Sequence, residues 1–182
     1  SIVSESERAG DVVRRLRDFF RTGTTHLESI ALGELLTSSV ASFSGRAEKT
    51  GIRLTLAPVP SCVLLADRLE LEVVIRNLLS NAFDAVSHQS AAKRRVHLSA
   101  VMEGPGRVCV QVEDSGPGLS ATTAARLFEP FESTKSSGLG LGLAISRAIV
   151  DAHGGSLWAE VGDHGVFKLV LLVEARVAHG DK

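Results

Sequence analysis

The apolar positions near the start of the chain follow a helical spacing. Between residues 4 and 22, Ala9, Val13, Leu16 and Phe20 recur at intervals of four, three and four, among charged side chains. This spacing predicts a helix with a narrow apolar seam, which needs a partner helix to cover it. Because the seam is shorter than three heptads, it is marginal as an isolated coiled coil, and we expect a monomer or a weak dimer.

From residue 26 onward, short apolar runs alternate with longer stretches of helical period. The short runs predict strands at 26–30, 52–57, 63–65, 96–101, 108–112, 156–161 and 166–173. The longer stretches predict helices at 32–47, 67–87, 120–127 and 140–152. The glycines and proline between residues 103 and 106 favour a turn, so the strands on either side of it are expected to form a hairpin.

The helix predicted at 67–87 begins with a capping signal, Asp67 followed three residues later by Glu70. At about 100° per residue, its apolar residues form one arc: Leu71, Val74, Ile75, Leu78, Leu79, Ala82 and Val86. Asn77, Asn81 and Asp84 form a polar stripe at the border of this arc. The stripe is either a polar flank satisfied by neighbouring backbone or, with Asn81 as an oxygen ligand, part of an Mg²⁺ site completed by phosphates and water.

The segment Asp114-Ser-Gly-Pro-Gly118 follows a predicted strand. Its glycines let a flat ring approach the backbone closely, and a carboxylate accepts a hydrogen bond from an exocyclic amine, so Asp114 would select adenine over guanine. Taken alone, the same residues are also typical of an ordinary turn.

The segment Gly138-Leu-Gly-Leu-Gly-Leu143 opens a predicted helix, an arrangement that binds phosphate through exposed backbone N–H groups. It matches neither the dinucleotide-binding nor the P-loop pattern, and a flexible hinge is the alternative interpretation. Residues 128–139 just before it are expected to form a lid, anchored by Phe128 and Phe131. Lys135 is near enough to reach a phosphate, although a solvated lysine explains it almost as well.

The overall composition narrows the function classes. The chain has 182 residues, with 20 Lys and Arg against 21 Asp and Glu, so we expect no attraction to nucleic acid or to a membrane surface. Cys62 and Cys109 lie in apolar runs without metal-ligand spacing, as in the reduced thiols of a cytoplasmic protein. No apolar run approaches the roughly 18 residues of a membrane span, although a longer parent protein can still be anchored in a membrane.

Four stretches, Asn77–Ala85, Asp114–Gly118, Leu127–Phe131 and Gly138–Leu143, follow one another in an informative order. Together they resemble the N, G1, F and G2 boxes of the ATP-binding domain of sensor histidine kinases, and the run to Lys135 resembles the lid of the nitrogen-regulation and oxygen-sensing kinases. The resemblance implies an α+β fold, a two-layer α/β sandwich in which a mixed, mostly antiparallel sheet is covered by three helices. Residues 1–23 would then be the end of the second dimerisation helix, and residues 24–178 the catalytic ATP-binding domain.

The resemblance also implies cofactors and roles. ATP and Mg²⁺ are the expected cofactors, with Asn81 as metal ligand and Asn77, Asn81 and Lys135 as the catalytic set. The expected nucleotide-binding residues are Asn81, Asp84, Ala85, Asp114, Gly116, Gly118, Leu119, Phe128, Thr134, Lys135, Gly138, Leu139, Gly140, Leu141, Gly142 and Leu143. Two positions depart from the family: Asp84 stands where many relatives have a basic residue, and Gly165-Val-Phe lacks a threonine that often follows this glycine.

The expected reaction is transfer of the γ-phosphoryl group of ATP to a histidine. Related ATPases use a glutamate as general base at the position of Asn77, and an amide cannot accept a proton in that role. None of the six histidines is followed by the acidic residue and proline of the family's acceptor box, so the acceptor helix is expected upstream in the parent kinase. A parent homodimer and the receiver domain of a cognate response regulator are the other expected partners.

Two other functions remain open at this point. One is a nucleotide-binding regulatory module that transfers no phosphate. The other is a serine kinase of the anti-sigma type, which shares the same boxes, although the apolar seam at residues 4–22 speaks against it because that class lacks such a helix.

Overall fold

A computed structural model describes residues 26–130 and 140–174. The helix predicted at 4–22 and five predicted site or lid residues lie outside this part of the chain: Phe131, Thr134, Lys135, Gly138 and Leu139. The described helices are α2 (Leu32–Thr50), α3 (Arg68–Val86), α4 (Ala121–Arg126), α5 (Gly142–Ala152) and the 3-10 turn η1 (Ala91–Lys93). The strands are β1 (Glu28–Ala31), β2 (Arg53–Leu56), β3 (Val63–Ala66), β4 (Arg95–Met102), β5 (Arg107–Asp114), β6 (Ser156–Ala159) and β7 (Gly165–Leu172).

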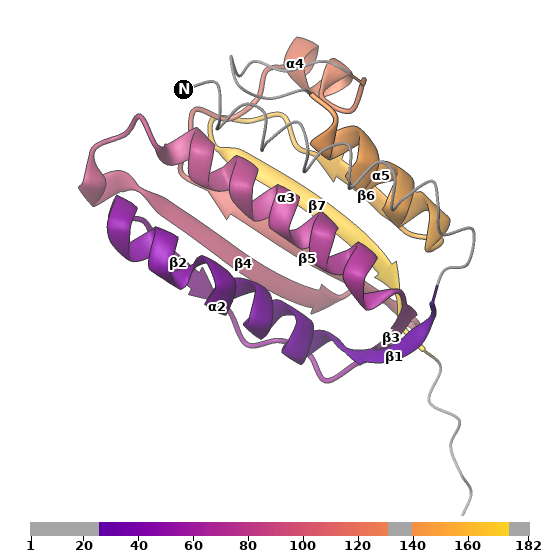
Figure 1. Ribbon diagram of the computed structural model, residues 1–182. Coiled ribbons are helices and arrows are strands. Elements are labelled where there is room, and N and C mark those ends of the chain that lie inside the picture. Colours follow the sequence, from indigo (N-terminus) through magenta and orange to yellow (C-terminus); the bar gives the residue numbers. More distant parts are fainter. Residues whose placement is uncertain (1–25, 131–139, 175–182) are drawn as a thin grey trace, which may run out of the picture.

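The larger sheet has five strands in the order β2-β4-β5-β7-β6. Strand β2 runs parallel to β4, and the other neighbouring strands are antiparallel. The predicted hairpin is therefore confirmed as β4 and β5. In this register Asp114, the last residue of β5, pairs with Val96 on one side and Gly165 on the other. Strands β1 and β3 form a separate antiparallel pair beside the main sheet (Figure 1).

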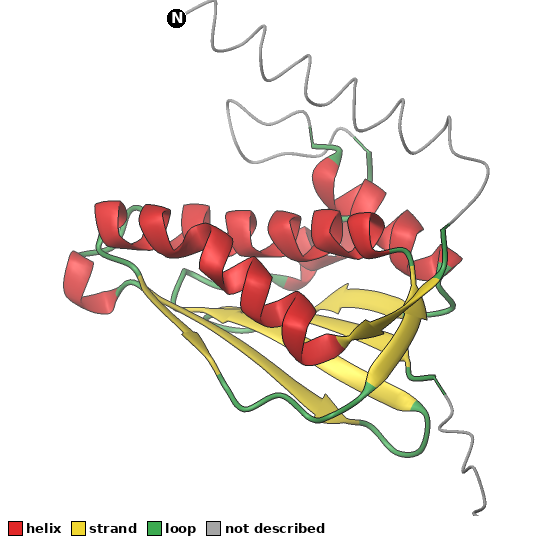
Figure 2. Cartoon of the chain, turned by 60° about the horizontal axis from the view of Figure 1, so that its bottom comes forward, coloured by secondary structure: helices red, strands yellow, loops and turns green. Residues whose placement is uncertain are grey.

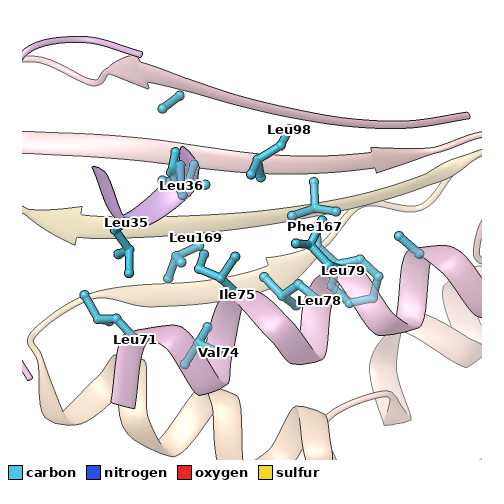
Figure 3. Packing of buried hydrophobic residues seen from close by; sticks show 14 of the residues in the cluster. Leu35, Leu36, Leu71, Val74, Ile75, Leu78, Leu79, Leu98, Phe167 and Leu169 are labelled. Carbon is cyan, nitrogen blue, oxygen red and sulfur yellow. The ribbon is translucent and has the colours of Figure 1, made fainter. Parts of the chain in front are cut away.

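Helices α2, α3 and α5 form a second layer on one face of the sheet (Figure 2). The strands alternate, so that Val96, Leu98 and Ala100 of β4 are buried toward the helices. All seven apolar residues predicted for the arc of α3 are buried, and Figure 3 shows Ile75, Leu78 and Leu79 pointing toward the strands of the sheet. The two-layer α/β sandwich expected from the resemblance is confirmed.

The core contains one large residue that the predicted arc of α3 left out. Phe83 is 1% exposed, and its ring packs edge-on against Phe43 of α2, with 5.1 Å between the ring centroids. This aromatic pair joins α2 to α3. The position was missed because Phe83 lies at the edge of the arc that faces α2 and not at its centre.

Most element ends lie close to the predicted ones because local capping groups set them. Asp67 caps α3, its carboxylate accepting a hydrogen bond from the N–H of Glu70 at 3.1 Å. Helix α5 ends at His153, and Gly154 follows in the left-handed conformation with φ of 69°. Helix α2 continues three residues beyond the predicted end at residue 47, to Thr50, where Gly51 terminates it in the same conformation. The turn η1 was not predicted.

Candidate functional site

Asn77 joins helix α3 to the first turn of α5. Its Nδ2 donates hydrogen bonds to the carbonyl oxygen of Gly142 and to Oγ of Ser146, each at 3.1 Å. The buried Ser146 hydroxyl donates to the same Gly142 carbonyl at 2.8 Å. The amide of Asn77 is thus engaged as a donor and fixes where the glycine-rich segment enters α5. The amide of Asn77 is therefore satisfied by one backbone and one side-chain partner on α5, and its predicted catalytic role stays a prediction.

The rest of the stripe on α3 follows one turn later. Asn81 and Ala85 are half-buried, on the side of the helix that Asn77 also occupies. Asp84 forms an ion pair with Arg46 of α2, with 2.7 Å between its Oδ1 and the guanidinium. Sequence reasoning missed Arg46, because no spacing signal connects two residues on different helices.

Asp114 is the most enclosed carboxylate of the site, with only 3% of the residue exposed. It accepts hydrogen bonds from the backbone N–H groups of Gly116, at 2.8 Å, and of Gly165. Burial raises the pKa of Asp114, and these two hydrogen bonds oppose the rise. A Cβ on Gly116 would lie 2.5 Å from the carboxylate, and one on Gly165 only 2.0 Å. Both positions therefore require glycine if Asp114 is to keep this place.

The loop after Asp114 is held against the loop between β6 and β7. Leu119 and Gly162 exchange two backbone hydrogen bonds, at 3.0 and 3.1 Å. Gly118, in the loop between β5 and Leu119, adopts a φ of 73°. A Cβ at this position would lie 2.1 Å from the carbonyl oxygen of Gly162. This close approach of two backbone segments requires glycine at position 118, and the predicted approach of a flat ring to the loop stays a prediction.

His164 stands next to this loop, between two carboxylates. Its Nδ1 lies 2.8 Å from Oδ1 of Asp163, and its Nε2 lies 3.6 Å from Oε1 of Glu113. The hydrogen bond to Asp163 raises the pKa of His164, and the charge of Glu113 adds to the effect. Sequence reasoning gave His164 no role, because its position beside Asp114 follows from strand register.

The glycine-rich segment is described from Gly140 onward. Gly140 has a φ of 65°, Leu141 caps α5 without a side-chain bond, and Leu143 packs against the core. Just before the gap in the described residues, Phe128 also packs against the core, and the guanidinium of Arg147 lies 5.0 Å from the centre of its ring. Phe128 is thus held against the core, while the lid predicted for residues 128–139 lies mostly outside the described residues and stays a prediction.

His153 joins α3 and α5 at their other ends. Its side chain is 3% exposed, its Nε2 accepts a hydrogen bond from the N–H of Asp67 at 3.0 Å, and its Nδ1 donates to the carbonyl of Ile149 at 2.8 Å. The hydrogen bond from Asp67 to His153 becomes visible only through the packing of the two helices.

Within residues 26–130 and 140–174, no three His, Cys, Asp or Glu side chains lie close enough together to hold a metal ion. Within the same residues, no helix has both the length and the apolar character to cross a bilayer. A surface hollow lies between α2 and β2, lined by residues such as Val40, Ile52 and Leu54, and its lining includes none of the predicted nucleotide residues.

Two curated relatives are similar over most of the chain. The sensor protein FixL of Bradyrhizobium diazoefficiens is 33% identical over 159 residues, which are 87% of this chain and 31% of FixL. The C4-dicarboxylate transport sensor protein DctB of Rhizobium meliloti is 36% identical over 180 residues, which are 96% of this chain and 28% of DctB. The chain therefore spans about a third or less of the length of these relatives.

Solved structures of histidine kinases share the fold. The nucleotide-free catalytic domain of the histidine kinase ThkA is 27% identical with a TM-score of 0.71, covering 81% of this chain and 95% of that domain. Full-length ShkA in complex with AMPPNP is 30% identical with a TM-score of 0.72, covering 85% of this chain and 33% of ShkA.

A family model covers more than half of the chain, at residues 66–175. This range begins at the last residue of β3 and includes α3, β5, α5 and β7, the elements that carry Asn77, Asp114, Gly142 and Gly165. The boxes that suggested the resemblance thus lie inside the matched range. The chain belongs to the family of histidine kinase-, DNA gyrase B- and HSP90-like ATPases.

Proposed function

We propose that this chain is the ATP-binding catalytic part of a sensor histidine kinase, which transfers the γ-phosphoryl group of ATP to a histidine on a helix outside the chain. The observation that carries the proposal is the hydrogen bonding of Asn77. Its amide donates to the Gly142 carbonyl and to Ser146, in the position where the related ATPases carry a glutamate base. Without a base to activate water, the site favours a protein acceptor over hydrolysis.

The nucleotide would lie between α3, the loop after β5 and the start of α5. Asp114 would accept a hydrogen bond from the adenine amine, beside Gly116, Gly118 and Leu119. The backbone at the start of α5, Gly140 to Gly142, would receive the phosphates. The predicted contacts of Thr134, Lys135, Gly138 and Leu139 fall outside the described residues and stay predictions.

Magnesium fits this site in one specific way. Asn81 offers an amide oxygen, and an Mg²⁺ ion there would take its other ligands from phosphate oxygens and water, which is how magnesium commonly binds beside nucleotides. The ion would neutralise charge on the phosphates. The protein would contribute by holding adenine and phosphates in line with the acceptor nitrogen, since positioning and electrostatics dominate phosphoryl transfer.

The relatives support the wider context of the proposal. Both curated relatives are named sensor proteins, and the alignment with DctB covers 96% of this chain, so it extends into residues 1–23. We propose that this segment is the end of a dimerisation helix and that residues 24–178 are the catalytic domain. We further propose that the chain lies in the cytoplasm and that its parent is a homodimer. The receiver domain of a response regulator would be the next phosphate acceptor.

Nucleotide binding is tested by titrating the 182-residue chain calorimetrically with AMPPNP, with and without Mg²⁺. We expect Asp114→Asn to abolish binding, Mg²⁺ to strengthen it and GTP not to compete. The matched control is Asp151→Asn, which removes an exposed carboxylate on α5. A folded chain that binds GTP as well as ATP, or an Asp114→Asn variant with unchanged affinity, would contradict the adenine site.

Phosphoryl transfer needs a second experiment. The acceptor helices of the parent are supplied in trans with γ-labelled ATP, and the chemical stability of the label is measured. An acid-labile, base-stable label on the acceptor supports a histidine kinase. Binding without label would favour a regulatory module, and an acid-stable label on a protein substrate would favour a serine kinase.

A further inference from the structure

Arg46 reaches from α2 across to the polar stripe of α3. Its guanidinium lies 2.7 Å from Oδ1 of Asp84 and 3.4 Å from Oγ of Ser80, and it stacks 5.2 Å from the centre of the Phe83 ring. The Phe83 ring is itself fixed by its edge contact with Phe43. The guanidinium is therefore held in one place by two hydrogen bonds and an aromatic face.

This position is at the edge of the proposed nucleotide site. Asp84 lies three residues after Asn81, and residues three apart on a helix have neighbouring side chains. One turn from the proposed Mg²⁺ ligand, the carboxylate of Asp84 would lie near the phosphates that this ion binds, while Asp114 on β5 would hold adenine. Without the charge of Arg46 beside it, this carboxylate would repel a triphosphate more strongly.

We propose that Arg46 is a further positioning residue of the nucleotide site, which neutralises Asp84 so that the charged phosphates of ATP can lie along the Asn81 turn of α3. The inference rests on the proposed function. Arg46 acts through Asp84, so its contribution depends on the charge of the ligand. It is greatest for a triphosphate and absent for adenosine.

A purely structural role for the pair leads to a different expectation. Arg46 and Asp84 side chains are 43% and 37% exposed, and an ion pair this exposed contributes little to stability. If the pair only joined α2 to α3, its loss would affect all adenine ligands alike, whatever their phosphate number. The dependence on phosphate charge therefore separates the two roles.

The test compares AMPPNP with Mg²⁺, measured calorimetrically, and adenosine, measured by NMR titration, on matched variants of the full chain. Arg46→Met keeps an unbranched stem over Phe83 but removes the charge. We expect it to weaken AMPPNP binding about fivefold at low ionic strength, less at high salt, and to leave adenosine affinity unchanged within about twofold. Adding Asp84→Asn to Arg46→Met should restore AMPPNP affinity, since no carboxylate then needs neutralising.

The control is Lys168→Met, which removes the cation of another ion pair. Nζ of Lys168 on β7 lies 2.5 Å from Oε1 of Glu160, the residue after β6. The Lys168→Met variant should change neither affinity. Equal AMPPNP affinities of wild type and Arg46→Met, an equal loss for adenosine, or a double variant that stays weak would overturn the inference alone. A folded wild-type chain that does not bind AMPPNP would overturn the proposed function, and the inference with it.

Discussion

Nδ2 of Asn77 and the carbonyl oxygen of Gly142 lie 3.1 Å apart and join α3 to the start of α5. A second hydrogen bond joins His153, at the end of α5, to Asp67, at the start of α3, so the two helices run antiparallel (Figure 1). The first junction, Asn77 with Gly142, lies in the proposed site. The second junction, Asp67 with His153, lies at the opposite end of α5. Their removal should therefore have different consequences for binding and for stability.

Removing the hydrogen bond between Asn77 and Gly142 should cost more in the free energy of nucleotide binding than in the free energy of unfolding. Asn77→Ala should cost about 1 kcal/mol in the free energy of unfolding, typical of a lost hydrogen bond, and should lower AMPPNP affinity because Gly142 is no longer held by α3. Asn77→Asp should cost more, since it sets a carboxylate against the Gly142 carbonyl. Urea denaturation and calorimetry measure both effects; an aspartate variant as stable as the alanine variant would contradict this account.

Gly165 should be intolerant of even a methyl group. In Gly165→Ala the new Cβ would lie 2.0 Å from Oδ2 of Asp114, so the carboxylate or strand β7 must move. We expect loss of AMPPNP binding and a destabilisation of about 2 kcal/mol or more, measured by denaturation. The control is Gly45→Ala, on an exposed face of α2 with no atom within 4 Å of the new Cβ, which should stabilise by about 0.5–1 kcal/mol. Equal binding by both variants would refute the close contact.

Comparison of Asp67, Asp114 and Arg46 explains what the sequence could predict. The cap at Asp67 and the apolar arc of α3 were predicted because their signals lie within one contiguous segment. Asp114 was recognised as a candidate from its own motif, but its partner Gly165 comes from β7 and meets it only through strand register. The Arg46–Asp84 pair depends on how α2 packs on α3. Contacts between distant segments leave no spacing in the sequence from which to predict them.

His164 should titrate above the ordinary histidine pKa of 6.5, because its hydrogen bond to Asp163 favours the imidazolium. The raised pKa of His164 in the folded state means that this interaction stabilises the fold fully below pH 6.5 and is lost as the pH rises through the folded-state pKa. NMR titration of the His164 ring measures the shift. Asp163→Asn should lower the pKa of His164 more than Glu113→Gln does, and the reverse order would show that Glu113 is the dominant partner.

The raised pKa of Asp114 predicts a stability that falls with rising pH, as for His164, but beginning at a lower pH. Because burial raises the pKa of Asp114 above its ordinary value of 3.8, the folded state retains this proton where the unfolded state has lost it. Stability contributed by Asp114 is therefore lost as the pH rises from 3.8 through the folded-state pKa. Between about pH 3.5 and about 7, the unfolding free energy of the wild type should therefore fall relative to that of Asp114→Asn. A difference that stays constant with pH would contradict the assignment.

The second junction between α3 and α5 should affect stability and leave binding intact. His153→Leu places an apolar side chain of similar size there, but it deprives the N–H of Asp67 of its acceptor and removes one of the two hydrogen bonds that the carbonyl of Ile149 accepts from residue 153. Because the histidine is buried, we expect a loss of about 2–4 kcal/mol in the free energy of unfolding. AMPPNP affinity at a temperature where the variant is folded should stay within about twofold, since Asn77 still holds Gly142. His88→Leu, at an exposed position after α3, is the control and should change neither quantity. If His153→Leu instead abolished binding in a folded protein, the two junctions would act as one unit, and His153 would belong to the machinery of the nucleotide site.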